Sequence, residues 1–248
     1  MTRIMFITPK GSMSDDVPTR RVIEAATLPG ITVDVVTLDD TVPATAFLPL
    51  PSVSMNQLLR RVEEAEAGGY DAVAVSCAAD PGVAIAKTLV SIPVTGPLEA
   101  ALHTSAALGG HLGIVTAKLE GSELEHQPTT VNWLRDLVQA YGMGHRIAGV
   151  RSVYPQHPAG EEAENLMRDD PDRLTDLIEQ GMRRAAEGPG LEAARALVTE
   201  GDATAVFFAC TQWGGLLDVV RASLPVPVID PIIDTIRYAD LLARVGRP

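Results

Sequence analysis

The stretch DAVAVSCAADPG, residues 71–82, joins an apolar run to a turn, and a cysteine lies at the junction. The alternating Ala-Val run has the character of a buried strand, and Asp-Pro-Gly is a typical turn sequence. A second stretch, ATAVFFACTQWGG (203–215), puts the only other cysteine, Cys210, at a similar junction. Both stretches raise the same question, whether the thiol is a core side chain or a chemically active group.

The surroundings of the two cysteines also correspond. A helical segment and then SIPVTGPLEAALHTSA (91–106) follow Cys77, whereas a helical segment and then PVPVIDPIIDTIRYAD (225–240) follow Cys210. Pro97 and Pro231 come after their cysteines at nearly the same interval. This weak internal repeat predicts two similar units, each with a cysteine at the carboxyl end of a strand. Ligands of parallel sheets bind at that end of the strands.

Short β-branched runs alternate with helix-patterned segments, which predicts an α/β fold with mostly parallel sheets. We predict helices at 130–141 and 231–244, the latter burying Ile232, Ile236, Ala239 and Leu242. The region 154–202 is expected to hold a surface loop and two helices that EGPG (187–190) interrupts. The strands are predicted at 3–8, 32–38, 72–77, 93–96, 112–116, 146–153, 205–210 and 227–230.

Composition excludes several classes of partner. The 248 residues, 46% of them hydrophobic, suffice for one large domain or two small lobes. The net charge of −12, without a basic stripe, argues against nucleic acid and against an anionic membrane. No apolar run is long enough for a signal peptide or a membrane span, so we expect a cytoplasmic protein. Scattered histidines and the lack of a nucleotide-binding glycine motif predict no metal and no cofactor.

The position of the cysteines favours chemistry over packing. Two thiols on opposite sides of one carbon can remove a proton and return it on the other face, which is racemisation or epimerisation by general acid–base catalysis. A helix N-terminus after each cysteine would favour the thiolate. The backbone amides of Ala78, Ala79, Thr211 and Gln212 are candidate donors to the carbonyl oxygen that takes up the charge. Since free cysteine is also a common core residue, simple packing stays open as an alternative.

The chain resembles the aspartate/glutamate/hydantoin racemase superfamily, and within it the hydantoin racemase group. The motifs that carry the resemblance are the first cysteine segment (71–101), LGIVT (112–116), AVFFACTQWGGL (205–216) and VPVIDPIIDTIRYADLL (226–242). The resemblance implies two Rossmann-like lobes with parallel sheets, related by pseudo-twofold symmetry, with the active site between them. We place the first lobe at 1–97 plus 220–248 and the second at 98–219.

The resemblance also implies which residues form the site. Cys77 and Cys210 would be catalytic, and the small polar residues Thr8 and Thr116 would help to hold a carboxylate or carbonyl. The sequence departs from the hydantoin racemases at Thr8-Pro9-Lys10, where they usually carry Asn-Pro-Asn, and Lys10 could pair there with an anionic group. CTQW is closer to the Cys-Thr of amino-acid racemases and maleate isomerases. Trp213 would either line the pocket or pack in the core.

These observations predict a cofactor-independent racemase or epimerase acting on a small carbonyl compound, hydantoin-like or an amino-acid derivative. A cis–trans isomerase of a maleate-like diacid, with Cys77 as nucleophile, is the alternative within the superfamily. A two-lobed ligand-binding protein with buried cysteines is the non-enzymatic alternative. The expected partner is a small anionic or carbonyl-containing molecule, and assembly into a homo-oligomer stays open.

Overall fold

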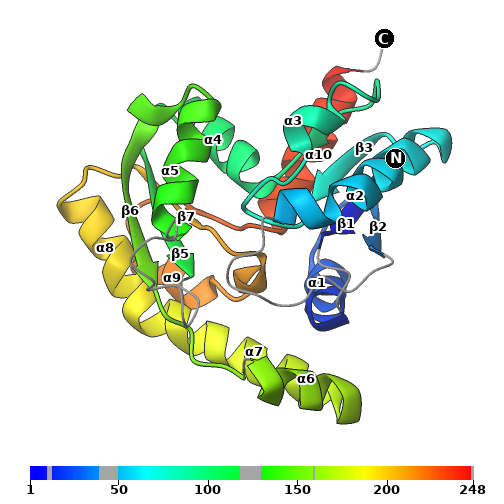
Figure 1. The fold of residues 1–248 in the computed structure, drawn as a ribbon. Helices are drawn as coiled ribbons and strands as arrows, with labels where there is room; N and C mark the ends of the chain where they lie inside the picture. Colours follow the sequence, from blue (N-terminus) through cyan, green and yellow to red (C-terminus); the bar gives the residue numbers. More distant parts are fainter. Residues whose placement is uncertain (10–12, 39–49, 118–129, 159, 247–248) are drawn as a thin grey trace. The chain divides into compact units, whose positions relative to one another are not determined.

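The computed structural model describes the chain except for residues 10–12, 39–49, 118–129, 159 and 247–248. The chain forms two compact units, each built on its own four-stranded parallel sheet (Figure 1). The first unit comprises Met1–Ala100 and Ile232–Pro248, and the second comprises Ala101–Pro231. The predicted α/β class with two parallel sheets is confirmed.

The unit boundaries differ from those expected from the sequence. The first boundary lies at Ala100, close to the expected division after residue 97. The second lies at Pro231, whereas residues 220–231 were expected in the first lobe. The reason is strand pairing: β8 (Val228–Ile229) is hydrogen-bonded to β7 (Ala205–Phe208) in the second sheet. Only the C-terminal helix that follows β8 belongs to the first unit.

The first sheet has the strand order β2-β1-β3-β4. Its strands are β1 (Thr2–Thr8), β2 (Ile31–Thr37), β3 (Ala72–Val75) and β4 (Val94–Thr95). Alternate residues of the central strand β1 enter different layers: Ile4 and Phe6 pack into one hydrophobic cluster, and Met5 and Ile7 into another. Burial on both faces explains why these strands appear in the sequence as continuous apolar runs.

Helices cover both faces of this first sheet. Side chains of α1 (Met13–Ala25) and α10 (Ile233–Val245) contribute to the cluster around Ile4, and those of α2 (Leu50–Ala67) and α3 (Val83–Ala86) to the cluster around Met5. The predicted C-terminal helix is confirmed. It buries Ala243 rather than Leu242 in its last turns.

The second sheet repeats the topology of the first, with the order β6-β5-β7-β8. Its other strands are β5 (Leu112–Ala117) and β6 (Ile147–Val153). Each sheet thus has the unit's first strand second in the order, flanked by the second and third strands, with the fourth outside the third. All eight predicted strands are present, and the internal repeat in the sequence corresponds to this repeated topology.

The helices of the second unit include a continuous stretch that the sequence did not suggest. Figure 1 shows α6, α7 and α8 following one another along the unit. The segment EGPG forms part of a π-helical turn, Ala186–Gly190, between α7 and α8 and does not break the helix. The wider turn can accept Pro189, which has no N–H to give to the regular ladder. The three helices are α6 (Gly160–Asp169), α7 (Pro171–Ala185) and α8 (Leu191–Thr199), and the second unit also contains α5 (Thr130–Ala140) and α9 (Asp218–Ser223). The helix α4 (Pro97–Ala107) begins in the first unit and continues into the second.

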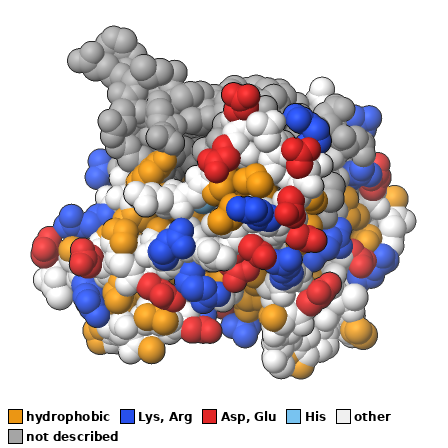
Figure 2. Space-filling model, turned by 90° about the horizontal axis from the view of Figure 1, so that it is seen from below, with side chains coloured by type: hydrophobic (Ala, Val, Ile, Leu, Met, Phe, Trp, Pro, Cys, Tyr) orange, Lys and Arg blue, Asp and Glu red, His pale blue; other side chains and the backbone are white. Residues whose placement is uncertain are grey.

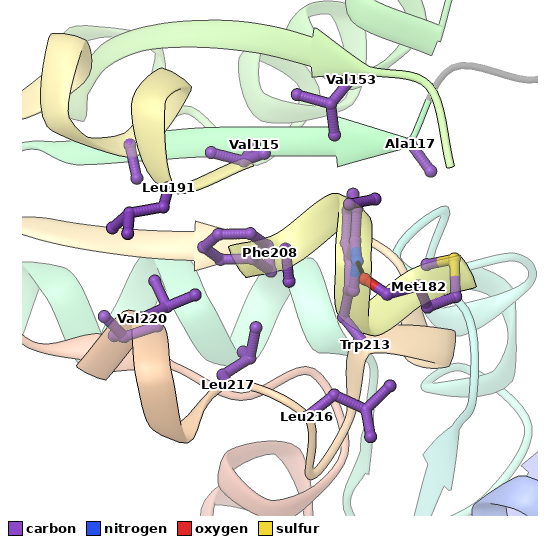
Figure 3. Close-up of a cluster of buried hydrophobic side chains, with 14 of the residues drawn as sticks. Val115, Ala117, Val153, Met182, Leu191, Phe208, Trp213, Leu216, Leu217 and Val220 are labelled. Atoms are coloured by element: carbon purple, nitrogen blue, oxygen red, sulfur yellow. Dashed lines mark hydrogen bonds between the residues drawn. The ribbon is translucent and has the colours of Figure 1, made fainter. Parts of the chain in front are cut away.

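Trp213 belongs to the core of the second unit. Its side chain is fully buried, and its indole N–H donates to the Met182 carbonyl oxygen at 3.0 Å (Figure 3). The ring meets that of Phe208 edge to face, with the centroids 5.2 Å apart. Of the two roles considered for Trp213, packing is therefore the one that the structure supports.

The surface carries charges of both signs. On the face shown in Figure 2, Lys and Arg side chains are interspersed with Asp and Glu and do not form a basic stripe. None of the helices in the described part of the chain is both long enough and apolar enough to span a membrane.

A charged cluster at the amino end of the first sheet gives a pH-dependent prediction. The Arg3 guanidinium lies over the Tyr70 ring at 3.8 Å and bonds Asp34 at 3.0 Å. Hydrogen bonding from the Tyr70 hydroxyl, followed by that from Arg3, lowers the pKa of Asp34 despite partial burial. Because the folded pKa is depressed, the ionised carboxylate stabilises the fold above the unfolded pKa, and this contribution is lost as the pH falls through the folded value.

We expect Tyr70→Phe to lower the free energy of unfolding at neutral pH by less than about 1 kcal/mol, because 42% of the Asp34 side chain is exposed and solvent screens its interactions. The difference from wild type should shrink in acid, where both proteins carry a neutral Asp34. Urea unfolding at a series of pH values measures it. A difference that is constant down to about pH 2 would mean that the hydroxyl acts through packing alone.

Candidate functional site

Cys77 lies where the chain leaves the first sheet. The Ser76 N–H still donates to the Ile7 carbonyl of β1 at 2.7 Å, but the Cys77 N–H turns back to Val75 at 2.9 Å. The Asp80 N–H then donates to the Cys77 carbonyl at 2.8 Å and closes a turn. These bonds end β3 two residues earlier than the predicted strand and place the cysteine at its carboxyl end.

Cys210 has the same hydrogen-bonded surroundings in the second unit. The Ala209 N–H donates to Val115 of β5 at 2.7 Å, and the Cys210 N–H to Phe208 at 2.9 Å. The Trp213 N–H donates to the Cys210 carbonyl at 3.0 Å. Each bond matches its counterpart around Cys77. The two cysteines therefore occupy equivalent places in repeated structures, as the sequence repeat predicted.

Both cysteines are thiols with partly buried side chains. Cys77 lies between buried residues, since Ser76, Ala78 and Ala79 are each at most 7% exposed. Around Cys210, the next two residues, Thr211 and Gln212, are half-buried and form a short 3-10 turn with Trp213. No long helix begins directly after either cysteine, because α3 starts only at Val83 and has four residues. The helix dipole expected from the sequence is therefore weak here, and backbone amides are the main local donors.

The two threonines expected at the site lie beside the cysteine loops, each within its own unit. Ile7 pairs with Val75, so Thr8 at the end of β1 is next to the start of the Cys77 loop. In the same way Thr116 of β5 follows Val115, the partner of Phe208. Both side chains are at most 1% exposed. The Thr8 hydroxyl is 3.4 Å from the Val36 carbonyl, and no described residue bonds the Thr116 hydroxyl.

Lys10, which the sequence suggested as a partner for an anionic group, lies outside the described residues. Within the described ranges, no group of three or more His, Cys, Asp or Glu side chains is arranged to hold a metal ion.

Asp80 ties the Cys77 loop to the next helix, a contact that the sequence analysis missed. Its two carboxylate oxygens accept hydrogen bonds from the backbone N–H groups of Leu98 at 3.1 Å and Glu99 at 2.8 Å. These amides lie in the first turn of α4, where helical N–H groups have no intrahelical partner. The one signal in the sequence was the aspartate of the Asp-Pro-Gly turn, which we took only as a turn former.

Glu99 is a second buried carboxylate that the sequence analysis did not identify. It is 6% exposed, pairs with the ammonium group of Lys87, and accepts a hydrogen bond from the Thr95 hydroxyl at 2.9 Å. Burial, and then the negative charge of Glu99, raises the pKa of Tyr238 on α10. The first turn of α4 is thus held from the strand before it and from α3.

Asp230 has a corresponding role in the second unit, although it lies after the outer strand and not in the loop after the cysteine. It follows β8, and its fully buried carboxylate accepts from the Gly215 N–H at 2.8 Å and from Arg221 at 3.1 Å. In the first unit the carboxylate comes from the cysteine loop, whereas here it comes from the residue after the last strand. In both units a buried aspartate joins the loop after the cysteine to the segment that follows the outer strand.

We expect Asp230→Ala to lower the free energy of unfolding by about 1–3 kcal/mol, because it leaves the Gly215 N–H and one edge of the Arg221 guanidinium without their charged acceptor. Asp230→Asn, which keeps one acceptor oxygen, should cost less. Urea unfolding followed by circular dichroism gives both values. A loss below about 0.5 kcal/mol for the alanine variant would show that water replaces the carboxylate.

The structure thus defines a class of protein: two α/β units of the same topology, each with a cysteine at the carboxyl end of its third strand. The sequence matches the model of the Asp/Glu/Hydantoin racemase family over residues 4–239. The chain belongs to this family, as its motifs indicated.

Curated relatives and solved structures agree with the family. A hydantoin racemase of Pseudomonas sp. (strain NS671) is 25% identical over 201 residues, which are 81% of this chain and 68% of the relative. The allantoin racemase structure from Klebsiella pneumoniae has a TM-score of 0.74 at 22% identity, with 99% of this chain and 89% of that one covered. The chain therefore shares the fold of this racemase.

A third match concerns a different reaction. A maleate cis–trans isomerase of Nocardia farcinica, solved with a covalently bound succinylcysteine intermediate, has a TM-score of 0.59 at 13% identity and covers 100% of this chain and 94% of that one. This similarity concerns the fold. At the level of the family, the expectation that the chain is an isomerase is confirmed by its racemase relatives.

Proposed function

We propose that the protein is a cofactor-independent racemase or epimerase of a small carbonyl compound, and that Cys77 and Cys210 transfer the proton. The observation that carries the proposal is the equivalence of the two cysteine loops. Each thiol follows the third strand of its sheet, held by three matching backbone hydrogen bonds. A reaction that needs two similar groups, one for each face of a carbon, accounts for this duplication.

In the proposed mechanism one cysteine reacts as a thiolate and the other as a thiol. The thiolate takes the proton from the carbon next to a carbonyl, and the electron pair of the broken C–H bond moves into the carbonyl as an enolate. The second thiol then gives its proton to the opposite face, and the carbonyl forms again. The protonation states of the two cysteines are exchanged at the end, so the enzyme is ready for the opposite enantiomer.

The enolate oxygen needs donors that are in place before the reaction. The N–H groups of Ala78 and Ala79 are suited to this role, because no oxygen of the described residues accepts from them. We assign Thr211 and Gln212 the corresponding role after Cys210, and Thr8, Lys10 and Thr116 the binding of a carboxylate or ring carbonyl. Apart from Lys10, which is not among the described residues, they come from the ends of four different strands or their following loops.

For the substrate we propose a hydantoin-like ring. The curated relative described above is named a hydantoin racemase and a structural relative an allantoin racemase. In such a ring the stereogenic carbon lies next to a carbonyl, so its proton is the one that this mechanism removes. Amino-acid derivatives with the same Cα–H next to a carbonyl form the second group of compounds for the assay.

The test is to incubate single enantiomers of 5-substituted hydantoins and amino-acid amides with the enzyme in deuterium oxide. We expect racemisation together with incorporation of one deuterium at the stereocentre, measured by polarimetry and mass spectrometry. Racemisation without deuterium incorporation would exclude proton exchange with solvent through the two thiols.

A maleate-type cis–trans isomerase is the second candidate, favoured by the structural similarity to that enzyme. In this reaction the Cys77 thiolate would add to the double bond, the other thiol would protonate the neighbouring carbon, and rotation and elimination would follow. Maleate added to the protein should then give a succinyl thioether on Cys77, which increases the mass of the Cys77 peptide by that of maleic acid. An unmodified peptide under turnover conditions would reject this candidate.

A further inference from the structure

We propose that Asp80 is a positioning residue for Cys77, holding the thiol in its reactive place by fixing the cysteine loop to the start of α4. The inference deepens the proposed function and rests on it. Asp80 makes two kinds of contact at once: its N–H bonds the Cys77 carbonyl at 2.8 Å, and its carboxylate bonds two amides of α4. Only one tight turn therefore separates Cys77 from a residue whose side chain is fixed to α4.

The backbone of Asp80 is in a conformation that needs such an anchor. Its φ of 44° lies in the left-handed region, which is unfavourable for a side chain with a Cβ and is best tolerated by Asn and Asp. The residue is only 5% exposed. Burial removes water from the Asp80 carboxylate, and hydrogen bonds from the Leu98 and Glu99 amides compensate for this loss. The contacts to α4 thus maintain the turn that carries Cys77.

The residues before α4 leave room for the Asp80 carboxylate. Gly96 precedes α4, and a Cβ at that position would be 2.2 Å from the Asp80 Oδ1 atom. A glycine is required here because any side chain would displace the carboxylate. Glu99 lies in the same helical turn and fixes it further through its bonds to Thr95 and Lys87. The anchor therefore connects Cys77 to a rigid element.

In the second unit, the turn after the cysteine is anchored by a different side chain. Trp213 takes the place of Asp80 there, since its N–H closes the turn on the Cys210 carbonyl. Its indole is anchored in the core, on Met182 and Phe208. Because the anchors differ, a change at Asp80 is expected to affect Cys77 and to leave Cys210 as an internal control.

The test uses Asp80→Asn and Gly96→Ala in the full-length protein. Asparagine keeps the tolerance for positive φ but offers only one acceptor oxygen, and its amino group would face the other N–H. Gly96→Ala leaves Asp80 intact and pushes its carboxylate away. Both variants should lower kcat about tenfold or more and leave KM within about threefold, because the misplaced base affects proton transfer more than binding. The two effects should not add in the double variant.

A second readout does not depend on turnover. Iodoacetamide alkylation is measured above the pKa of both thiols, so that the rate reports access to sulfur and not ionisation. Peptide mass spectrometry separates the two sites. We expect Cys77 to react about threefold faster or more in both variants, as the released loop exposes it, and Cys210 to keep its wild-type rate.

Val62→Ala in α2 is the matched control. Val62 is fully buried in the first unit, and its aliphatic side chain cannot hydrogen-bond to the Asp80 carboxylate, which is bonded by the Leu98 and Glu99 amides. It should lower stability and leave the alkylation rate of Cys77 unchanged. Wild-type Cys77 rates in both test variants, or an equal acceleration in Val62→Ala, would overturn the positioning role. If alkylation changes as expected but no hydantoin or amino-acid amide is turned over, the proposed function fails while the anchoring of Cys77 stands.

Discussion

Replacing Cys77 or Cys210 with alanine is expected to abolish racemisation, lowering kcat by about 10³-fold or more, because each thiol supplies a proton transfer that water cannot replace. The side chains are small and partly buried, so the variants should keep the fold. Polarimetry on the best hydantoin substrate measures the rate. Serine at either position should be nearly as inactive, since its hydroxyl stays protonated at neutral pH, and it serves as the size-matched control.

Deuterium exchange then separates the roles of the two cysteines. With one thiol left, a proton can still be removed from one face and returned to it, which exchanges the proton without inversion. Cys77→Ala should therefore exchange one enantiomer and Cys210→Ala the other. The double variant should exchange neither. Exchange that persists in the double variant would show that other residues act as the bases and would end the two-cysteine mechanism.

The strands were predictable because buried parallel strands are short runs of apolar, β-branched residues bounded by turn formers. What the sequence did not show was where a strand stops pairing. The run 72–77 continues in sequence through Ser76 and Cys77, but β3 ends at Val75, because the Ser76 N–H makes the last bond to β1 and the Cys77 N–H turns back to Val75. Those two residues make the difference between a core cysteine and one at the end of the sheet.

The cysteines, as candidates, could be found from the repeat in the sequence, but their anchors could not. Asp80 bonds amides 18 and 19 residues away, a contact set by the packing of α4 and invisible to local periodicity. Asp230 likewise reaches back 15 residues to Gly215. Local turn rules account for the backbone at these aspartates and say nothing of where their carboxylates go.

The π-helical turn was missed for a related reason. Glycine and proline in EGPG normally end a helix, and the expectation of a break followed from local propensity. Here Gly190 packs closely against its neighbours. A Cβ at this position would be 2.7 Å from the Ala185 carbonyl oxygen and 3.1 Å from the Phe208 ring. Tertiary contact with β7 therefore keeps the chain helical through the turn, which no reading of the segment by itself could indicate.

The largest effect on stability is expected at Trp213. We expect Trp213→Ala to lower the free energy of unfolding by about 3–5 kcal/mol, because it removes the largest side chain that is fully buried among the described residues and leaves a cavity between β7 and α7. Urea unfolding followed by circular dichroism gives the value. Trp213→Phe is the matched control, since it keeps an aromatic ring against Phe208 and removes the indole N–H.

The phenylalanine variant should cost less than about 2 kcal/mol, because the Met182 carbonyl keeps a second donor, the Ala186 N–H at the end of α7. The phenylalanine variant also separates the effect of Trp213 on stability from its effect on the position of Cys210. If Trp213 holds Cys210 through the bulk of its ring, Trp213→Phe should keep the wild-type alkylation rate of Cys210, whereas Trp213→Ala should raise it. A loss below about 1 kcal/mol for the alanine variant would mean that the surrounding core closes over the gap, and that the turn after Cys210 is held by its backbone hydrogen bonds alone.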